Sequence, residues 1–361
     1  MATIKGETII LTITNRCNLK CSYCYERLKN KSDMSQQKAI EIISNVLENS
    51  LYPTVEIDFH GGEPLLNFPL IKNTCEYFWQ QKQKRPYMFF ASTNGSCLTE
   101  EMKNWFIIHK DRICLGLSLD GTPQMNYTNR GYYIPDDVLD FFVTTWPHQS
   151  VKMTISPNTI SNIGDGIIFA HKKGFEVSVN LAYGINWDKK LVPIYEQELR
   201  KVLQFYLDNP NIKPCSIFDK TVKEIFYTTP LKRFCGAGKQ LKAFDIDGNM
   251  YPCHVFGPNT LNISDWEKIK QLDLSHDEDL FIDKECTGCP IQRICPTCHG
   301  MNYLERGDVG KRDKRLCPFI KTEKKLLCLY LKETILQKDI NELNETDYLE
   351  LSAVKKLLSD L

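Results

Sequence analysis

CNLKCSYCYE, residues 17–26, directly follows a run of apolar and β-branched residues that is typical of a β-strand. Three residues and then two separate its cysteines, Cys17, Cys21 and Cys24. Three thiolates on one short loop can hold three irons of a four-iron, four-sulfur cluster and leave the fourth iron open to a cofactor or substrate. Structural zinc fits less well, because no other Cys or His near Cys24 supplies a fourth ligand.

The same loop carries a family resemblance. CNLKCSYC matches the CxxxCxxC signature of the radical S-adenosylmethionine (radical SAM) enzymes, with the aromatic Tyr23 before the last cysteine. Downstream, HGGEPLL at residues 60–66 is similar to the GGE segment of that family. The resemblance implies that Gly61, Gly62 and Glu63 receive the methionyl ammonium of the cofactor. A strand-end turn is the alternative for a GGE segment standing alone.

Two further segments end strand-like runs, STNG at 92–95 and LSLDG at 117–121. The resemblance implies that they contact the ribose and carboxylate of the cofactor through Ser92, Asn94, Ser118 and Asp120, although a simple turn is the alternative for each. Arg130 is the candidate for the cofactor carboxylate, because a guanidinium donates two parallel hydrogen bonds. A solvated loop position is the alternative for Arg130.

The resemblance also implies a chemistry. An electron from the reduced cluster cleaves S-adenosylmethionine, and the resulting deoxyadenosyl radical abstracts hydrogen from a substrate. Because that radical attacks almost any C–H bond, we expect the site to exclude water and to orient one substrate hydrogen.

Composition narrows the function classes. The chain has 361 residues, no net charge and 15 cysteines, so the overall field favours neither nucleic acid nor a membrane surface. The N-terminal apolar stretch is short and lacks a basic leader, and no stretch is long enough to span a bilayer. Cysteines in such a chain indicate metal ligands in a reducing cytoplasm rather than disulfides. The basic run KRDKR at 311–315 is predicted to be a solvated patch.

The first half of the chain alternates strand and helix patterns. Helical patterns lie between the strands, for example 35–47 with Ser35 as the cap and 160–173 closed by Gly174. This rhythm predicts an α/β fold, a partial (β/α)6 TIM barrel with the motifs at the carboxyl ends of its strands. The predicted strands are 7–14, 54–60, 87–93, 112–120, 151–156 and 176–182.

A cysteine-rich second half follows the barrel. Its spacing resembles the SPASM extension of radical enzymes that modify peptides and proteins. That resemblance implies two auxiliary clusters, and Asp247-Gly248 independently predicts a hairpin that ends near Cys253. The implied ligands are Cys235, Cys253 and Cys298 for the first cluster and Cys286, Cys289, Cys295 and Cys317 for the second.

This chain departs from the SPASM pattern twice. Only two residues separate Cys295 from Cys298, and Thr229 stands where the sulfatase-maturing branch has a cysteine before Cys235. Either Cys215 completes the first auxiliary cluster or that cluster keeps an open iron. The remaining cysteines are predicted to be small buried hydrophobes, namely Cys75, Cys97, Cys114, Cys215 and Cys328.

The predicted domains are the barrel at 1–190, a helical linker at 191–234, the SPASM domain at 235–320 and C-terminal helices at 321–361. Helices are expected at 195–207, 321–337 and 347–358. The tail is too short for a leader-binding module, so recognition of a leader peptide would use the barrel surface or a separate protein.

Two branches of the resembled architecture compete. One matures ribosomally made peptides by thioether or carbon–carbon crosslinks, and the other oxidises Ser or Cys of a sulfatase to formylglycine. His254 stands where the second branch has a proton-accepting Asp; it is a tentative catalytic residue or a partly buried neighbour of a cluster. We favour peptide maturation, with a peptide or protein substrate and a flavodoxin or ferredoxin as reductant. A non-catalytic electron-transfer protein and a tRNA modifier are the alternatives from other classes.

Overall fold

The computed structural model describes residues 6–361 except 230 and 232. The chain forms two compact units. The first reaches to residue 118 and includes residues 130–149 and 235–280. The second contains residues 119–129, 150–234 and 281–361. Each unit combines parallel strands with helices, so the predicted α/β fold class is confirmed.

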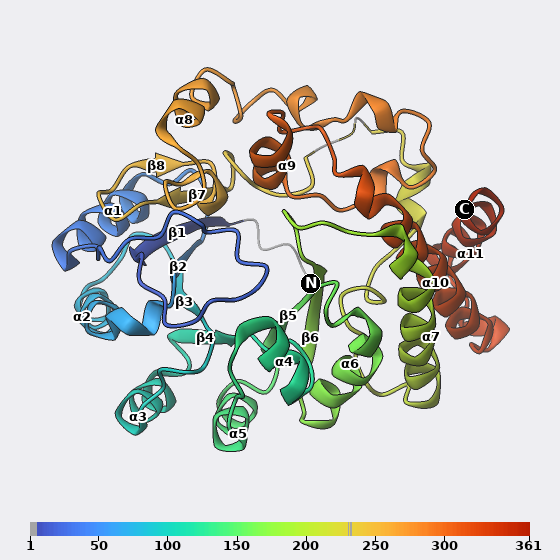
Figure 1. Cartoon of the computed structure of the whole chain (residues 1–361), viewed down its shortest axis with the longest axis horizontal. Coiled ribbons are helices and arrows are strands. Elements are labelled where there is room, and N and C mark those ends of the chain that lie inside the picture. Colours follow the sequence, from blue (N-terminus) through green and yellow to red (C-terminus); the bar gives the residue numbers. More distant parts are fainter. Residues whose placement is uncertain (1–5, 230, 232) are drawn as a thin grey trace. The chain divides into compact units, whose positions relative to one another are not determined.

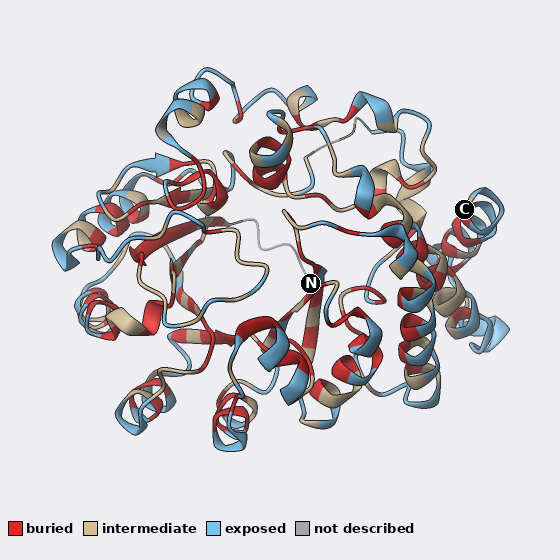
Figure 2. Ribbon diagram, in the orientation of Figure 1, coloured by how far each residue is buried: buried red, intermediate tan, exposed pale blue. Residues whose placement is uncertain are grey.

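Parallel strands form the core of the first unit. The sheet order is β4-β3-β2-β1-β7-β8, with β1 to β4 and β7 parallel and β8 antiparallel. Ile9, Leu11 and Ile13 of β1 are fully buried, as expected for a central parallel strand. Figure 2 shows β1 mostly in the colour of buried residues. The strands are β1 Glu7–Thr14, β2 Val55–Gly61, β3 Tyr87–Thr93, β4 Ile113–Leu117, β7 Leu241–Phe244 and β8 Met250–Tyr251.

Helices of the first unit follow their strands, and Figure 1 shows α1, α2 and α3 outside β1 to β4. The hydroxyl of Ser35 accepts a hydrogen bond from the Lys38 N–H, as the predicted cap requires. The helices are α1 Gln36–Asn49, α2 Phe68–Trp79, α3 Glu100–His109, α5 Asp136–Thr145 and α8 Ile263–Ile269.

The second unit is built on the parallel pair β5 Ser150–Ile155 and β6 Glu176–Leu181. The Tyr195 hydroxyl donates to Glu323 Oε1 at 2.8 Å and ties α7 to α10. Helix α11 packs on α10 and accepts backbone N–H groups of Val222 and Lys223 through Glu350. The helices are α6 Ile163–Lys172, α7 Val192–Asp208, α9 His299–Arg306, α10 Cys317–Leu336 and α11 Glu345–Asp360, while α4 Pro123–Arg130 crosses the boundary of the two units.

The predicted hairpin at Asp247-Gly248 joins the barrel strands. Gly248 has φ +89°, a conformation that favours glycine, and its N–H donates to Asp245 O at 3.0 Å. The first strand of this hairpin, β7, pairs in parallel with β1 from Thr8 to Leu11. Cys253 follows β8, the antiparallel second strand of this hairpin.

Among the residues that the structure describes, no helix is both long and apolar enough to cross a membrane.

Candidate functional site

Hydrogen bonds join the two chain segments that flank the cysteine loop. Arg16 donates to both carboxylate oxygens of Asp33, at 2.9 and 2.7 Å, and the Asn15 N–H donates to Ser32 O at 2.9 Å. Cys17, Cys21 and Cys24 lie between these ends and are half-buried thiols. The Cys24 N–H donates to Cys21 O in a tight turn, and Lys29 Nζ lies 3.3 Å from Cys24 Sγ. The hydrogen bonds between these flanking segments order the loop that carries the three sulfurs.

Gly61 and Gly62 pack directly on the backbone of the cysteine loop. The Gly62 N–H donates to Thr14 O at 3.0 Å and the Glu63 N–H donates to Arg16 O at 2.8 Å. A Cβ at Gly61 would lie 2.2 Å from Thr14 O, and one at Gly62 would lie 2.3 Å from Arg16 O. Glycine is thus required at both positions for the end of β2 to approach the loop.

Glu63 is buried at the ends of β2 and β3, with 1% of its surface exposed. Its Oε1 accepts from Thr93 Oγ1 at 2.7 Å and from the Leu65 N–H at 3.1 Å, and its Oε2 accepts from the Asn94 N–H at 2.8 Å. Burial raises the pKa of Glu63, although the bonds from Asn94 and Thr93 favour its carboxylate form. The carboxylate therefore holds the two strand ends together as well as placing negative charge beside the loop.

The STNG segment contacts the cysteine loop through Asn18. Asn94 Nδ2 donates to Asn18 Oδ1 at 3.1 Å, and Asn18 Nδ2 donates to Ser96 Oγ at 2.6 Å. Ser92 is half-buried within β3, and the Ser118 N–H extends the pairing of β4 by donating to Thr93 O. The structure therefore brings the ends of β1 to β4 together around one loop, as the motif positions predict.

Arg130 is buried rather than solvated, with 8% exposure. Its guanidinium carbon lies 5.6 Å from the centre of the Tyr23 ring, and its charge favours the carboxylate form of Glu63. Two predicted cofactor residues, Tyr23 and Arg130, thus lie in contact beside the cysteine loop.

Asp120 belongs to the second unit, where it is fully buried. Its Oδ1 accepts from the Thr154 N–H at 2.9 Å and its Oδ2 from Asn129 Nδ2 at 3.2 Å. Asn129 continues this polar network by accepting from Ser156 Oγ at 2.6 Å. These contacts give Asp120 a structural task in linking α4 to β5.

Cys235 and Cys253 lie in the first unit, and Cys253 is buried. The chain between them folds back, with the Gly238 N–H donating to Pro252 O at 2.9 Å. Cys298 lies in the second unit as the residue that precedes α9. Its assignment to the same cluster stays a prediction.

His254 packs against a second histidine. The ring centroids of His254 and His60 are 4.6 Å apart, and His60 Nε2 lies 3.4 Å from Glu26 Oε1. Burial, together with the His60 charge, lowers the pKa of His254 to about 3. Burial also disfavours the charged form of His60, but Glu26 outweighs it and raises the His60 pKa. His254 is therefore neutral at pH 7 and a weak base.

A cavity in the second unit, here the cysteine cavity, is lined by all four cysteines assigned to the second auxiliary cluster: Cys286, Cys289, Cys295 and Cys317. Tyr183, Arg312 and Lys321 also line it. Cys317 is the first residue of α10, followed by Pro318, which is suited to a first helical turn. Residues up to 31 positions apart in sequence thus present their thiols to one space.

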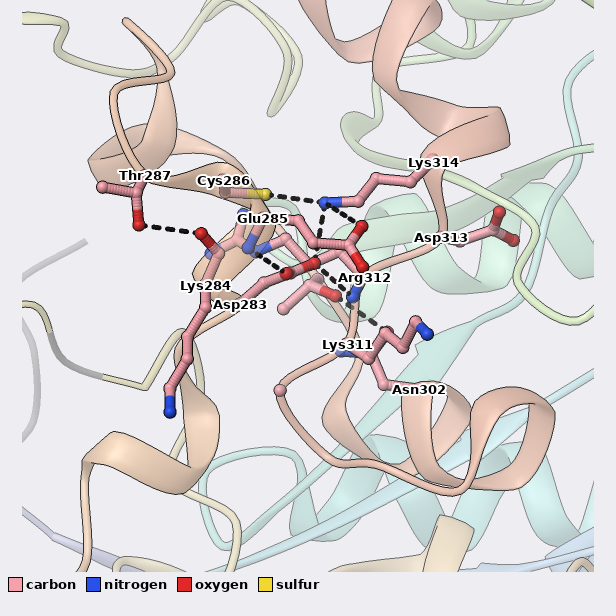
Figure 3. A network of polar contacts seen from close by, with 12 residues as sticks. Asp283, Lys284, Glu285, Cys286, Thr287, Asn302, Lys311, Arg312, Asp313 and Lys314 are labelled. Carbon is pink, nitrogen blue, oxygen red and sulfur yellow. Dashed lines mark hydrogen bonds and ion pairs between the residues drawn. The ribbon is translucent and has the colours of Figure 1, made fainter.

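The basic run at 311–315 was predicted to be a solvated patch. Lys311, Lys314 and Arg315 are exposed, as predicted, whereas Arg312 is half-buried. Arg312 Nη1 donates to Cys295 O at 2.7 Å. Lys314 Nζ donates to Asp283 Oδ2 at 2.8 Å and to Cys286 Sγ at 3.1 Å (Figure 3). No local sequence signal separates these cations from surface lysines, because their partners lie at 283–295.

The cysteines outside the proposed clusters differ in burial. Cys75, Cys215 and Cys328 are buried, as predicted, whereas Cys97 and Cys114 are only half-buried. Cys215 is fully buried and its backbone N–H donates to the Tyr206 hydroxyl at 2.8 Å. None of the 15 cysteines, all within the described part of the chain, forms a disulfide.

Within residues 6–361 apart from 230 and 232, no three Cys, His, Asp or Glu side chains converge on a point that one metal ion could occupy. Tetrahedral zinc requires such convergence. A four-iron cluster does not, because each thiolate binds a different iron. The all-thiolate donor set is what fits such a cluster.

Comparison with known proteins identifies the family. Residues 11–122 match the model of the radical SAM superfamily. This chain belongs to the radical SAM superfamily. Of the curated relatives, an uncharacterised protein of Methanocaldococcus jannaschii is 37% identical over 319 residues, 87% of this chain and 93% of the relative.

Two solved structures share the fold of this radical SAM enzyme. Native anSMEcpe with bound AdoMet and Cp18Cys peptide is 17% identical, with a TM-score of 0.66 over 92% of this chain and 98% of the other. Streptococcus suis SuiB bound to precursor peptide SuiA is 18% identical, with a TM-score of 0.56 over 86% of this chain and 76% of SuiB. The matched residues contain the cysteine loop, the GGE segment and STNG, so S-adenosylmethionine and a four-iron cluster are the cofactors of this enzyme.

Proposed function

We propose that this radical SAM enzyme modifies a peptide, most simply by forming a thioether or carbon–carbon crosslink during maturation of a ribosomally made peptide. The observation that carries the proposal is the cysteine cavity, since a second cluster site beyond the N-terminal loop is expected of a SPASM enzyme. The peptides bound to the solved neighbours anSMEcpe and SuiB support a peptide substrate.

In this proposal, Cys17, Cys21 and Cys24 hold the radical SAM cluster. When bound, that cluster supplies the electron that cleaves S-adenosylmethionine. Glu63 places a carboxylate for the cofactor ammonium, and Arg130 places a guanidinium for the cofactor carboxylate. Glu63 follows β2 and Arg130 ends α4, and their opposite charges match those of the amino-acid part of the cofactor.

The first auxiliary site is proposed to have three protein ligands, Cys235, Cys253 and Cys298. Cys215 is fully buried and its backbone N–H donates to the Tyr206 hydroxyl, so we propose that it packs as a small hydrophobic residue rather than serving as the fourth ligand. A three-cysteine site leaves one ligand position for a substrate thiol. This arrangement favours a thioether product over a carbon–carbon bond.

Sulfatase maturation is the second candidate, supported by the fold shared with anSMEcpe. That reaction needs a proton acceptor where this chain has His254. A histidine with a pKa of about 3 takes up a proton poorly at neutral pH. The geometry therefore favours peptide crosslinking. A flavodoxin or ferredoxin as reductant and a separate leader-binding protein remain parts of the proposal.

The test uses anaerobically reconstituted full-length protein whose Cys17, Cys21 and Cys24 are replaced by Ala. A Cys-containing substrate peptide should perturb the spectrum of the remaining clusters, and the same peptide with Ser for Cys should not. Mass spectrometry of the wild-type reaction should then show loss of two hydrogens from the Cys peptide. If neither peptide changes the spectrum and Cys215→Ala loses iron, then Cys215 is the fourth ligand of the first auxiliary cluster. That result would refute the thioether proposal.

A further inference from the structure

Lys314 brings a cation into direct contact with a sulfur of the cysteine cavity. Its Nζ lies 3.1 Å from Cys286 Sγ. Figure 3 shows the lysine side chain extending toward Cys286, with the Asp283 carboxylate close to the same amine. A charged donor at this distance forms a strong hydrogen bond to a thiolate.

Asp283 fixes both members of this contact. Its Oδ2 accepts from Lys314 Nζ at 2.8 Å and from the Arg312 N–H at 2.9 Å, while its Oδ1 accepts from the Glu285 N–H at 2.9 Å. The last bond caps the short 3-10 helix Lys284–Cys286. One carboxylate, 5% exposed, therefore positions the ammonium and the turn that carries the Cys286 sulfur.

The charge states of the pair are well defined. Burial opposes ionisation of Asp283, but Lys314 and the two N–H groups lower its pKa. Burial also opposes the charge on Lys314, but Asp283 and the Cys286 sulfur raise its pKa. Lys314 is thus an ammonium throughout the range in which such enzymes are assayed, so its effect on the cavity does not depend on titration.

We propose that Lys314 is a positioning residue that raises the reduction potential of the second auxiliary cluster through its hydrogen bond to Cys286. This inference rests on the proposed assignment of that cluster to Cys286, Cys289, Cys295 and Cys317. Hydrogen bonds to the sulfurs and nearby charge are main determinants of cluster potential. One-electron reduction makes the cluster more negative, so a fixed cation stabilises the reduced state more than the oxidised state.

Arg312 acts in the same direction. Its Nη1 donates to Cys295 O, and its guanidinium lines the cysteine cavity. Arg312 and Lys314 come from one short loop. The Asp283 carboxylate accepts a hydrogen bond from the backbone N–H of Arg312 and another from the side chain of Lys314.

The experiment is an EPR-monitored redox titration of reconstituted full-length Lys314→Gln, Lys314→Arg and wild-type protein. Variants lacking the Cys17 loop thiols, or Cys235 and Cys253, assign the signals of the other clusters. Lys284→Gln is the matched control, because it removes the same charge two residues from Cys286, and Figure 3 shows the Lys284 amine pointing away from that sulfur. Iron is counted in every sample.

Lys314→Gln should shift the reduction equilibrium of this cluster about tenfold toward the oxidised state, which is about 59 mV for one electron. Lys314→Arg should restore most of the potential. Lys284→Gln should leave it close to wild type, because the Lys284 amine points away from the Cys286 sulfur and salt screens a charge that makes no direct contact. Iron content should not change in any of the three.

Two results distinguish failure of this inference from failure of the cluster assignment. Full iron with the same potential in Lys314→Gln, or an equal shift in Lys284→Gln, would overturn the role of Lys314 alone. Loss of about four irons per chain in Lys314→Gln would also overturn it, since Lys314 would then serve assembly. If Cys286→Ala and Cys317→Ala leave the iron content unchanged, the cluster assignment itself is wrong.

Discussion

Replacing Gly62 with Ala should empty the radical SAM cluster site while leaving the rest of the fold in place. The new Cβ would lie 2.3 Å from Arg16 O, 2.6 Å from Arg16 C and 2.8 Å from the Cβ of Cys17. Overpacking of this kind costs about 1–3 kcal/mol. Because two of the three obstacles are backbone atoms rather than flexible side-chain ends, we expect about 3 kcal/mol, the upper end of that range.

The new methyl group of Gly62→Ala would displace the backbone of Arg16. Arg16 O accepts the Glu63 N–H at 2.8 Å, so pushing this carbonyl away breaks the contact between the GGE segment and the cysteine loop. Cys17 is the next residue and moves with it. We therefore expect Gly62→Ala to lose about four irons, the content of one cluster, together with cofactor cleavage.

The assay combines iron analysis with thermal unfolding of reconstituted protein. Gly307→Ala is the control, because Gly307 has φ +71° in the C-cap of α9 and no neighbouring atom of the described residues lies within 4 Å of the place that a methyl group would take there. An alanine at this position costs about 1–2 kcal/mol through backbone strain, yet it lies outside the cysteine loop and should keep all its iron. Gly62→Ala with a full iron complement and normal cofactor cleavage would refute the reasoning.

Four further outcomes are expected. Replacing Cys17, Cys21 and Cys24 together with Ala should remove one cluster and all cofactor cleavage but keep the auxiliary clusters, and stoichiometric zinc in their place would contradict this. Glu63→Ala should weaken cofactor binding by roughly one to two orders of magnitude, since a charged hydrogen bond contributes about 1.5–3 kcal/mol. Equilibrium dialysis of protein with intact clusters measures this affinity. An unchanged affinity would mean that Glu63 only joins the strand ends. Because burial raises the pKa of Glu63, wild-type affinity should fall on acidification at a pH above that of an ordinary glutamate, and Glu63→Gln should lose this dependence. Cys215→Ala should cost about 1 kcal/mol of stability, as for another small buried group, without loss of iron.

Much of the barrel could be predicted because its strands are buried on both faces. The runs at 7–14 and 87–93 coincide with β1 and β3, since a central parallel strand reads as a nearly continuous apolar or β-branched segment. The predicted strand at 112–120 is longer than β4, which ends at Leu117. The Leu119 N–H donates to Lys152 O, a partner on β5 that no local pattern identifies.

In the candidate site, too, contacts between residues far apart in the sequence could not be predicted. The resemblance to the SPASM pattern, rather than cysteine spacing alone, grouped the four cysteines that line the cysteine cavity. The partnership of Asp283 with Lys314 spans 31 residues and arises only when the 3-10 turn and the basic loop fold against each other. Likewise, the pairing of β7 with β1 joins segments more than 200 residues apart, and an Asp-Gly turn indicates a hairpin but not the sheet that it joins.

Helix α10 begins at Cys317, and its later turns pack on α7 and α11. Under the proposed assignment of Cys317 to the second auxiliary cluster, iron binding would stabilise the C-terminal helices, because a ligand that binds the folded form stabilises whatever is folded with it. Loss of iron from Cys317, for example through damage by oxygen, would destabilise the first turn of α10 and the packing of α11 on that helix.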